Sequence, residues 1–195
     1  TSIVTQTVYG IGTFMNQSRR YMLQKTASSS EYLTVYNEHG DVILEGNVWL
    51  SGVNVETKSD GTNTVSVLMS FTIGENNIKY LLTHTYTNYD SMGRVTYTSN
   101  EAGDSTRYSY DASGNITDET VITGNKANVT INTYDEYGRL TSTRTDVHKR
   151  PNKDSYMSLS KTGVTTTYTY DIQGRVLSET LSQGENSLTT HTFSY

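Results

Sequence analysis

Polar residues alternate with apolar or aromatic residues over most of this chain. Tyr108 and Tyr110, for example, alternate with the polar residues Arg107 and Ser109. A period of two residues is typical of β-strands that cover one face of a sheet. Residues 15–30 fit a short helix as well as a strand, and no longer segment has a helical period. The alternation therefore predicts an all-β fold.

One motif, Tyr-Asp-x-x-Gly-Arg/Asn-aliphatic, occurs four times. Its tyrosines lie 21, 24 and 36 residues apart, a spacing that fits two strands and two connections per copy, the last enlarged by an insertion. A weaker copy, VYNEHGDVI, contains Tyr36. The residues that define the four full copies, and to which we assign a structural role, are Tyr89, Asp90, Gly93, Tyr110, Asp111, Gly114, Tyr134, Asp135, Gly138, Tyr170, Asp171 and Gly174.

The motif predicts the tip of a β-hairpin. Asp at the first position of a type I turn accepts hydrogen bonds from the amides of the turn, and Gly three residues later adopts φ > 0 without steric cost. A three-residue loop with a glycine bulge then places Tyr110 opposite Ile116, and Asp111 opposite Asn115. The same register in the other copies predicts Tyr–aliphatic pairs on the buried face and three Asp–Arg pairs on the other: Tyr36–Val42, Tyr89–Val95, Tyr134–Leu140, Tyr170–Val176, Asp90–Arg94, Asp135–Arg139 and Asp171–Arg175.

These tips predict an antiparallel meander of consecutive hairpins that forms a long twisted or curled sheet. We expect a hairpin array over residues 84–195 and an N-terminal β region over residues 1–83, which together form one continuous structural unit. Residues 146–155, with the only proline, are expected to form a long exposed loop. The N-terminal half is expected to close or cap the sheet, because it carries most of the bulky apolar residues, including Trp49, Leu50, Leu68, Met69, Phe71, Leu81 and Leu82.

The recurring Tyr-Asp-x-x-Gly-Arg motif resembles the YD repeat of the Rhs family, which includes bacterial Rhs proteins, shell subunits of insecticidal toxin complexes and animal teneurins. The resemblance covers about residues 84–181. In that family the repeats form long strands wound into a hollow shell around a cargo. Four or five copies are too few to enclose a cargo domain, and the protease and toxin segments that usually follow the shell have no counterpart here. The resemblance implies the hairpin architecture of a small exported bacterial protein. Tyr195 lies where the next copy would begin, and we expect it to end a final strand.

Composition narrows the classes of partner and location. The formal net charge of −5 provides no basic footprint, so we expect no nucleic acid partner. No apolar run approaches the ~18 residues that a membrane-spanning helix needs. The chain contains no cysteine and is rich in Thr, Ser and Asn. We therefore expect an exported protein without disulfides, and with the resemblance above this implies a secreted, periplasmic or cell-surface bacterial protein.

The sequence indicates no catalytic, cofactor or metal site. Its four histidines are far apart in sequence, and no catalytic or phosphate-binding motif is present. Residues 111–119 place oxygen ligands at alternate positions, but the turn already explains their Asp and Gly.

Three functional hypotheses remain. The first is a non-catalytic structural or protein-interaction module at the cell surface. The second is a carbohydrate-binding module, whose aromatic side chains stack on a cell-surface glycan from an exposed sheet face; its candidates are Trp49, Tyr97, Tyr137 and Tyr156. The third is a hydrolase whose carboxylates meet only in the fold, roughly 5–10 Å apart in a cleft.

Overall fold

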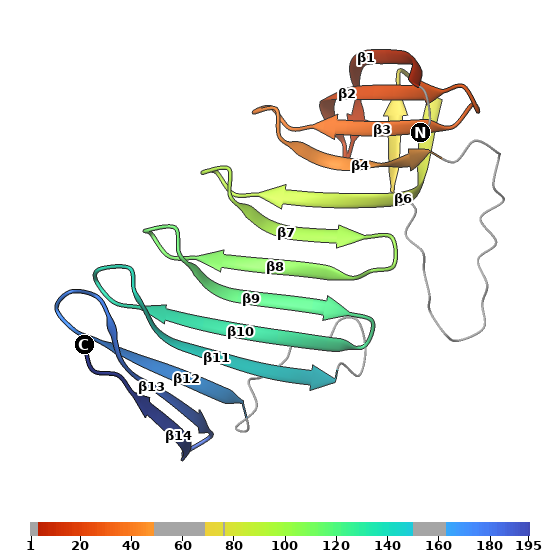
Figure 1. The fold of residues 1–195 in the computed structure, drawn as a ribbon. Helices are drawn as coiled ribbons and strands as arrows, with labels where there is room; N and C mark the ends of the chain where they lie inside the picture. Colours follow the sequence, from red (N-terminus) through yellow and green to blue (C-terminus); the bar gives the residue numbers. More distant parts are fainter. Residues whose placement is uncertain (1–3, 49–68, 76, 150–162) are drawn as a thin grey trace. The chain divides into compact units, whose positions relative to one another are not determined.

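The computed structural model describes residues 4–48, 69–75, 77–149 and 163–195 (Figure 1). All regular elements in these residues are antiparallel β-strands, which confirms the predicted fold class. The described residues therefore include no helix that could cross a membrane. The chain divides into two compact units, Thr1–Gly103 and Asp104–Tyr195, which we call the barrel unit and the meander unit.

The barrel unit contains a closed barrel of six strands and one further strand. β1 is followed by β2, β3 and β4 in the sheet, and β5 closes the barrel by pairing with both β6 and β1. The closing pairs on β1 are Gly12 with Ile73 and Thr13 with Thr72. The strands are β1 (Val4–Phe14), β2 (Gln17–Thr26), β3 (Glu31–Tyr36), β4 (Val42–Val48), β5 (Ser70–Ile73), β6 (Asn77–Tyr89) and β7 (Val95–Asn100). Residues 15–30, which fit either element by sequence, thus contain strand β2.

Strand β6 connects the closed part of the unit to the hairpins. Its N-terminal residues pair with β5, its middle pairs with β4, and its C-terminal residues pair with β7. A strand of 13 residues is long enough to serve all three partners. The position near residue 84, where the sequence suggested a boundary, lies inside this strand.

The hydrophobic core lies inside the barrel. Alternate residues of the strands point inward, so that Leu33 and Val35 on β3 are fully buried. Leu81 is buried, whereas its neighbour Leu82 points outward and is 46% exposed. The core consists of Phe14, Tyr21, Leu23, Leu33, Val35, Leu44, Val48, Phe71 and Leu81, with Met69 among the residues packed against it.

Two glycines allow the barrel to close tightly. A Cβ at Gly46 would lie 1.9 Å from the backbone oxygen of Thr83 on the neighbouring strand. A Cβ at Gly12 would lie 2.4 Å from the ring of Phe71. Because only glycine permits these approaches, both positions are determined by packing in the barrel.

A buried carboxylate also lies in the barrel unit. Glu31 is 6% exposed, and its oxygens lie 2.6 Å from Lys79 Nζ and 3.1 Å from Lys25 Nζ. Burial acts to raise the pKa of Glu31, but the hydrogen bonds and charges of the two lysines outweigh it and leave the pKa below its ordinary value. The carboxylate is therefore held ionised in the fold.

The described residues of the meander unit form seven strands, each paired with the next in sequence. Among its described residues, Ala127 is the only buried apolar side chain. The strands are β8 (Ser105–Tyr110), β9 (Ile116–Thr123), β10 (Lys126–Tyr134), β11 (Leu140–Lys149), β12 (Val164–Tyr170), β13 (Val176–Gln183) and β14 (Asn186–Thr192).

Two expectations need correction in this unit. The first four residues of the predicted loop over 146–155 belong to β11, and Asp146 is buried beside Arg144 and His148; the rest of that segment lies outside the described residues. The Tyr and aliphatic side chains of the tips, including Tyr134 and Leu140, are half-buried rather than buried. The single apolar residue buried in the described part of the unit provides no barrel-like interior to enclose them.

Candidate functional site

The tip between β10 and β11 shows how one copy of the motif is held. Asp135 Oδ1 accepts hydrogen bonds from the backbone N–H groups of Tyr137 and Arg139, and Oδ2 lies 2.6 Å from Arg139 Nε. The Gly138 N–H donates to the Asp135 carbonyl at 3.0 Å, and Gly138 has a φ of 76°. The Asp therefore organises the turn, and the Gly completes it where other residues are strained.

The other copies repeat this geometry. Asp90–Arg94 and Asp171–Arg175 are ion pairs of 2.7 and 2.6 Å, and in the copies without Arg an Asn amide donates to the Asp instead. Strand pairing confirms the predicted register in all five copies: Tyr36–Val42, Tyr89–Val95, Tyr110–Ile116, Tyr134–Leu140 and Tyr170–Val176.

These contacts keep the Asp side chains ionised. For Asp90, the hydrogen bond from the Arg94 backbone is the main cause of a pKa below the ordinary value. For Asp135 and Asp171, partial burial acts to raise the pKa, but hydrogen bonds from the Arg four residues later outweigh it. A carboxyl group that must donate a proton needs the opposite shift. The tips are therefore suited to structure rather than to acid catalysis.

Successive copies are joined by the tyrosine hydroxyls. Tyr170 Oη donates to the Leu140 carbonyl at 2.7 Å, and Tyr134 Oη donates to the Ile116 carbonyl at 2.9 Å. Tyr89 Oη makes the same contact with Val42 at 3.1 Å. In each case the acceptor is the aliphatic residue of the preceding copy. The sequence pattern did not reveal this role, because the acceptor is a backbone group of another hairpin.

The motif arginines also reach the next copy. Arg139 Cζ lies 4.7 Å from the centre of the Tyr170 ring, and Arg139 Nη1 donates to the Asp171 carbonyl at 3.2 Å. Arg175 lies in the same way over Tyr195, at 4.5 Å. We call this set of contacts, a Tyr hydroxyl to a carbonyl and an Arg over a Tyr ring, the interlock. Tyr195 thus occupies the position of a next-copy tyrosine, but it lies beyond the last strand, β14, which ends at Thr192, and so does not end a strand as expected.

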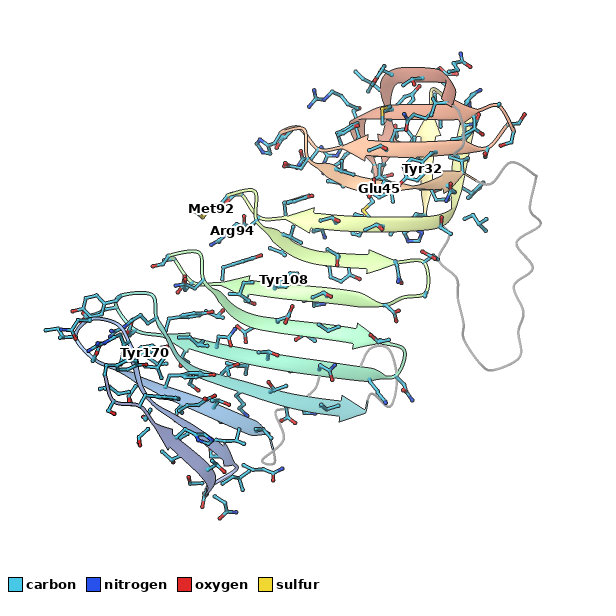
Figure 2. The ribbon with its side chains drawn as sticks, viewed as in Figure 1. Tyr32, Glu45, Met92, Arg94, Tyr108 and Tyr170 are labelled. Carbon is cyan, nitrogen blue, oxygen red and sulfur yellow. The ribbon has the colours of Figure 1, made fainter. Side chains whose placement is uncertain are left out.

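A second tyrosine supports two of the copies. Tyr108 and Tyr168 lie opposite Glu119 and Glu179 on the neighbouring strands (Tyr108 is labelled in Figure 2). Burial raises the pKa of both phenols, and the facing carboxylates raise it further. Both tyrosines therefore remain protonated within the sheet.

The interlock leaves the two variable residues of each tip facing outward. Met92 is 70% exposed, Tyr137 is 74% exposed and Ile172 is 94% exposed. Figure 2 shows Met92 at the end of the β6–β7 tip, with Arg94 beside it. Large apolar side chains at the most exposed positions of a turn contribute little to packing within the chain. They make the tips candidate contact points.

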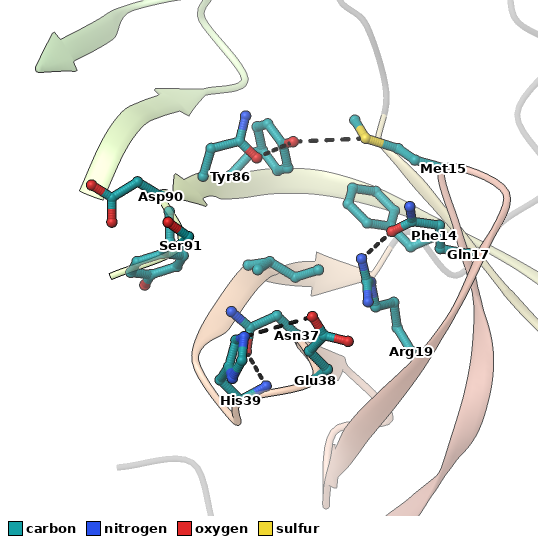
Figure 3. A pocket seen from close by; sticks show the side chains of 13 residues that line it. Phe14, Met15, Gln17, Arg19, Asn37, Glu38, His39, Tyr86, Asp90 and Ser91 are labelled. Carbon is teal, nitrogen blue, oxygen red and sulfur yellow. Dashed lines mark hydrogen bonds and ion pairs between the residues drawn. The ribbon is translucent and has the colours of Figure 1, made fainter. Parts of the chain in front are cut away.

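A pocket lies among three hairpin tips of the barrel unit (Figure 3). It has a volume of about 590 Å³ and is formed by residues of the β1–β2 turn, the β3–β4 tip and the end of β6, and we call it the tip pocket. Phe14 and Tyr86, in edge-to-face contact at 5.9 Å, provide apolar surface, whereas Arg19 and His39 are polar.

The β1–β2 turn bears a strained residue at the edge of this pocket. Met15 and Asn16 have φ of 48° and 62°. A non-glycine residue in this region costs about 1 kcal/mol, and Met has no local hydrogen bond to offset the strain, unlike Asn. The thioether of Met15 accepts a hydrogen bond from Tyr86 Oη at 3.7 Å.

The four residues predicted to stack on sugars are not equivalent. Tyr97 is half-buried and packs edge to face with Tyr86 at 6.2 Å. Tyr137 is exposed at a tip, with Arg139 Cζ 5.1 Å from its ring centre. Trp49 and Tyr156 lie outside the described residues, as do Leu50 and Leu68.

The tip pocket does not provide the pair of carboxyl groups that the hydrolase hypothesis needs. The carboxylates that line the pocket are Glu38 and Asp90, and Asp90 forms an ion pair with Arg94. Within the described ranges, no group of three or more metal-ligating side chains is placed to hold an ion.

Comparison with known families found no family model that matches the chain, and comparison with curated proteins found no match.

Proposed function

We propose that this protein is a non-catalytic structural and protein-interaction module built from YD-like hairpins, exported and displayed at the bacterial cell surface. The observation that carries the proposal is the interlock. The constant residues of the repeat are used in the turns and between copies, while the variable residues of the tips are exposed.

This separation of constant and variable residues suits a protein that presents its hairpin tips to a partner. The interlock holds neighbouring tips by contacts that do not depend on the variable residues. Tyr137 and Ile172 of the meander unit then present separate apolar contacts from a regular frame, and Met92 presents another from the barrel unit. Aromatic residues and Met are enriched at the centres of protein interfaces, so a protein surface is the partner that these side chains fit best.

The test is site-specific photo-crosslinking in cells that produce the protein. A photoreactive residue at Tyr137 or Ile172 should give a discrete adduct with one protein, and the chain should fractionate outside the cytoplasm. Lys126, exposed at the opposite end of β10 from the Tyr137 tip, is the matched control. A chain confined to the cytoplasm, or the same adducts from Lys126 as from the tips, would contradict the proposal.

A carbohydrate-binding role is the second candidate, and one observation favours it. The outer surface of the barrel unit exposes aromatic side chains, with Tyr9 73% exposed. A glycan array probed with the full chain tests this role, and the absence of binding across a broad panel would remove it.

A further inference from the structure

A shallow depression on the outer face of the barrel unit combines aromatic rings with a cation. It has a volume of about 290 Å³ and is lined by Tyr9, Gly10, Arg20, Tyr21, Tyr36 and Gly40; we call it the tyrosine slot. None of these residues lines the tip pocket.

Strand pairing explains why the side chains of the slot meet. Arg20 on β2 lies opposite Ile11 on β1 and opposite Tyr36 on β3. Directly paired residues project from the same face of a sheet, and Tyr9 is two residues from Ile11 on that face. Arg20 therefore lies in a row between Ile11 and Tyr36, with Tyr9 diagonal to it.

The apolar side chains of this row are unusually exposed. Tyr9 is 73% exposed and Ile11 is 71% exposed, although both lie in the middle of a strand. The neighbouring positions Gly10 and Gly12 face inward against Tyr21 and Phe71. The outward residues are thus not required by the core, and an aromatic residue exposed to this degree is available to a ligand.

Arg20 differs from the motif arginines. Arg94, Arg139 and Arg175 each form an ion pair with the Asp of their own tip. In the described part of the chain the Arg20 side chain has no ion pair and no hydrogen bond. Arg20 is exposed, and its Nη2 lies beside the β3–β4 tip, 3.7 Å from where a Cβ would stand at Gly40.

We propose that the tyrosine slot binds a pyranose that carries a carboxylate, such as a uronic acid unit of an acidic polysaccharide. The guanidinium of Arg20 receives the carboxylate through two parallel hydrogen bonds. The rings of Tyr9 and Tyr36 contact the apolar C–H face of the sugar, as aromatic side chains with a polar tip do at wet surfaces. An acidic peptide supplies the carboxylate but no pyranose C–H face for the tyrosines.

This site is independent of the display role proposed above. It lies on β1, β2 and β3 of the barrel unit, whereas Tyr137 and Ile172 belong to the meander unit. Loss of sugar binding leaves crosslinking at the tips unchanged, and loss of crosslinking leaves sugar binding unchanged.

The test is a titration of the full chain with each probe, monitored by amide NMR shifts and by calorimetry. The probes are trigalacturonic acid, its uncharged galactose counterpart and tetraglutamate. Trigalacturonic acid should bind roughly ten- to a hundredfold more tightly than the uncharged sugar, the difference expected of a charge-assisted contact. The shifts should map to Tyr9, Arg20 and Tyr36.

The neighbouring arginine provides a matched control. Arg20→Gln should abolish the preference for the charged sugar, whereas Arg19→Gln makes the same charge change at the tip pocket and should preserve it. Tyr9→Ala should weaken both sugars and leave the melting temperature unchanged, because Tyr9 is exposed. No binding of trigalacturonic acid, an equal effect of the two arginine variants, or equal affinity for tetraglutamate would overturn the proposal.

Discussion

The barrel unit and the meander unit use the same alternating strands but are stabilised differently. In the described part of the barrel unit, nine core residues fill the interior of a closed sheet. In the meander unit, the described residues bury a single apolar side chain, Ala127, and successive hairpins are joined by Tyr hydroxyls and Arg–Tyr contacts. Burial of apolar area favours folding without regard to direction, whereas the interlock depends on geometry.

The comparison teaches where each unit is sensitive to change. In a packed interior a few buried side chains provide much of the stability. Truncating one of them leaves a cavity. An interlock distributes stability over copies, and each contact contributes a small increment. A repeat array can therefore vary its exposed tip residues without weakening its frame.

Leu33→Ala is expected to have the largest effect. Leu33 is fully buried, and removing its side chain should destabilise the barrel unit by about 2–5 kcal/mol. The matched change Leu140→Ala truncates a half-buried side chain in the meander unit and should cost clearly less. Denaturant unfolding measured for both variants checks the difference, and equal losses would show that the units do not differ in this respect.

Acid should weaken the barrel unit before the meander unit. Burial lowers the pKa of His84, and the charge of Glu101 offsets this shift only in part. Lys79 and Lys25 lower the pKa of Glu31. In the unfolded chain His84 and Glu31 bind protons near pH 6.5 and 4.5, respectively. Their contributions to the stability of the fold are therefore present above these pH values and are lost as the pH falls.

In the unfolded chain the tip carboxylates take up protons only below about pH 3.8. The meander unit should therefore lose stability at lower pH than the barrel unit. Amide signals of each unit followed from pH 7 to 3 check the order. Glu31→Gln should flatten the response of the barrel unit near pH 4.5. Simultaneous loss of both sets of signals in the wild-type chain would contradict the expected order.

Gly138→Val should destabilise the meander unit by more than about 1 kcal/mol, because a β-branched side chain is strained at φ > 0. A Cβ at Gly138 would meet no atom within 4 Å, so the effect isolates backbone strain. Gly138→Asn is the control, since Asn tolerates this conformation. If the bulge geometry is correct, the melting temperature of the Asn variant should lie between that of the Val variant and that of the wild type.

Asn115→Arg should give the smallest effect, and a favourable one. Asn115 is the only residue at the Arg position of the four full copies that is not Arg, and Arg there can pair with Asp111 and extend over Tyr134 as Arg139 does over Tyr170. A gain of about 0.5–1 kcal/mol is expected from the cation–π contact. Asn115→Lys is the control for charge alone, and an equal gain from Lys would refute a contact that needs the planar guanidinium.

Much of the meander unit could be predicted from sequence because its information is local. Asp, Gly and the two intervening residues determine the turn, and the turn determines the register of the strands on either side. For that reason the three Tyr–aliphatic pairs of this unit follow from seven-residue segments alone, as do the two pairs of the barrel unit. Their degree of burial did not follow, because it depends on what covers the face of the sheet.

The candidate sites were harder to predict. Tyr97 and Tyr137 are candidates only if they face solvent, which the sequence does not reveal; Tyr137 is exposed and Tyr97 is half-buried. Tyr9 and Arg20 resemble ordinary strand residues in the sequence. Their proximity depends on the pairing of β1, β2 and β3.

The sequence by itself determined the all-β class, the hairpin tips and their register, since these arise from interactions within a few residues. The tertiary structure decided that β5 closes the barrel against β1, that β6 serves three partners, and that the Tyr hydroxyls of the interlock bind the preceding copy. Such contacts join residues far apart in the chain, and their free energy depends on which surfaces remain to be buried once the hairpins have formed.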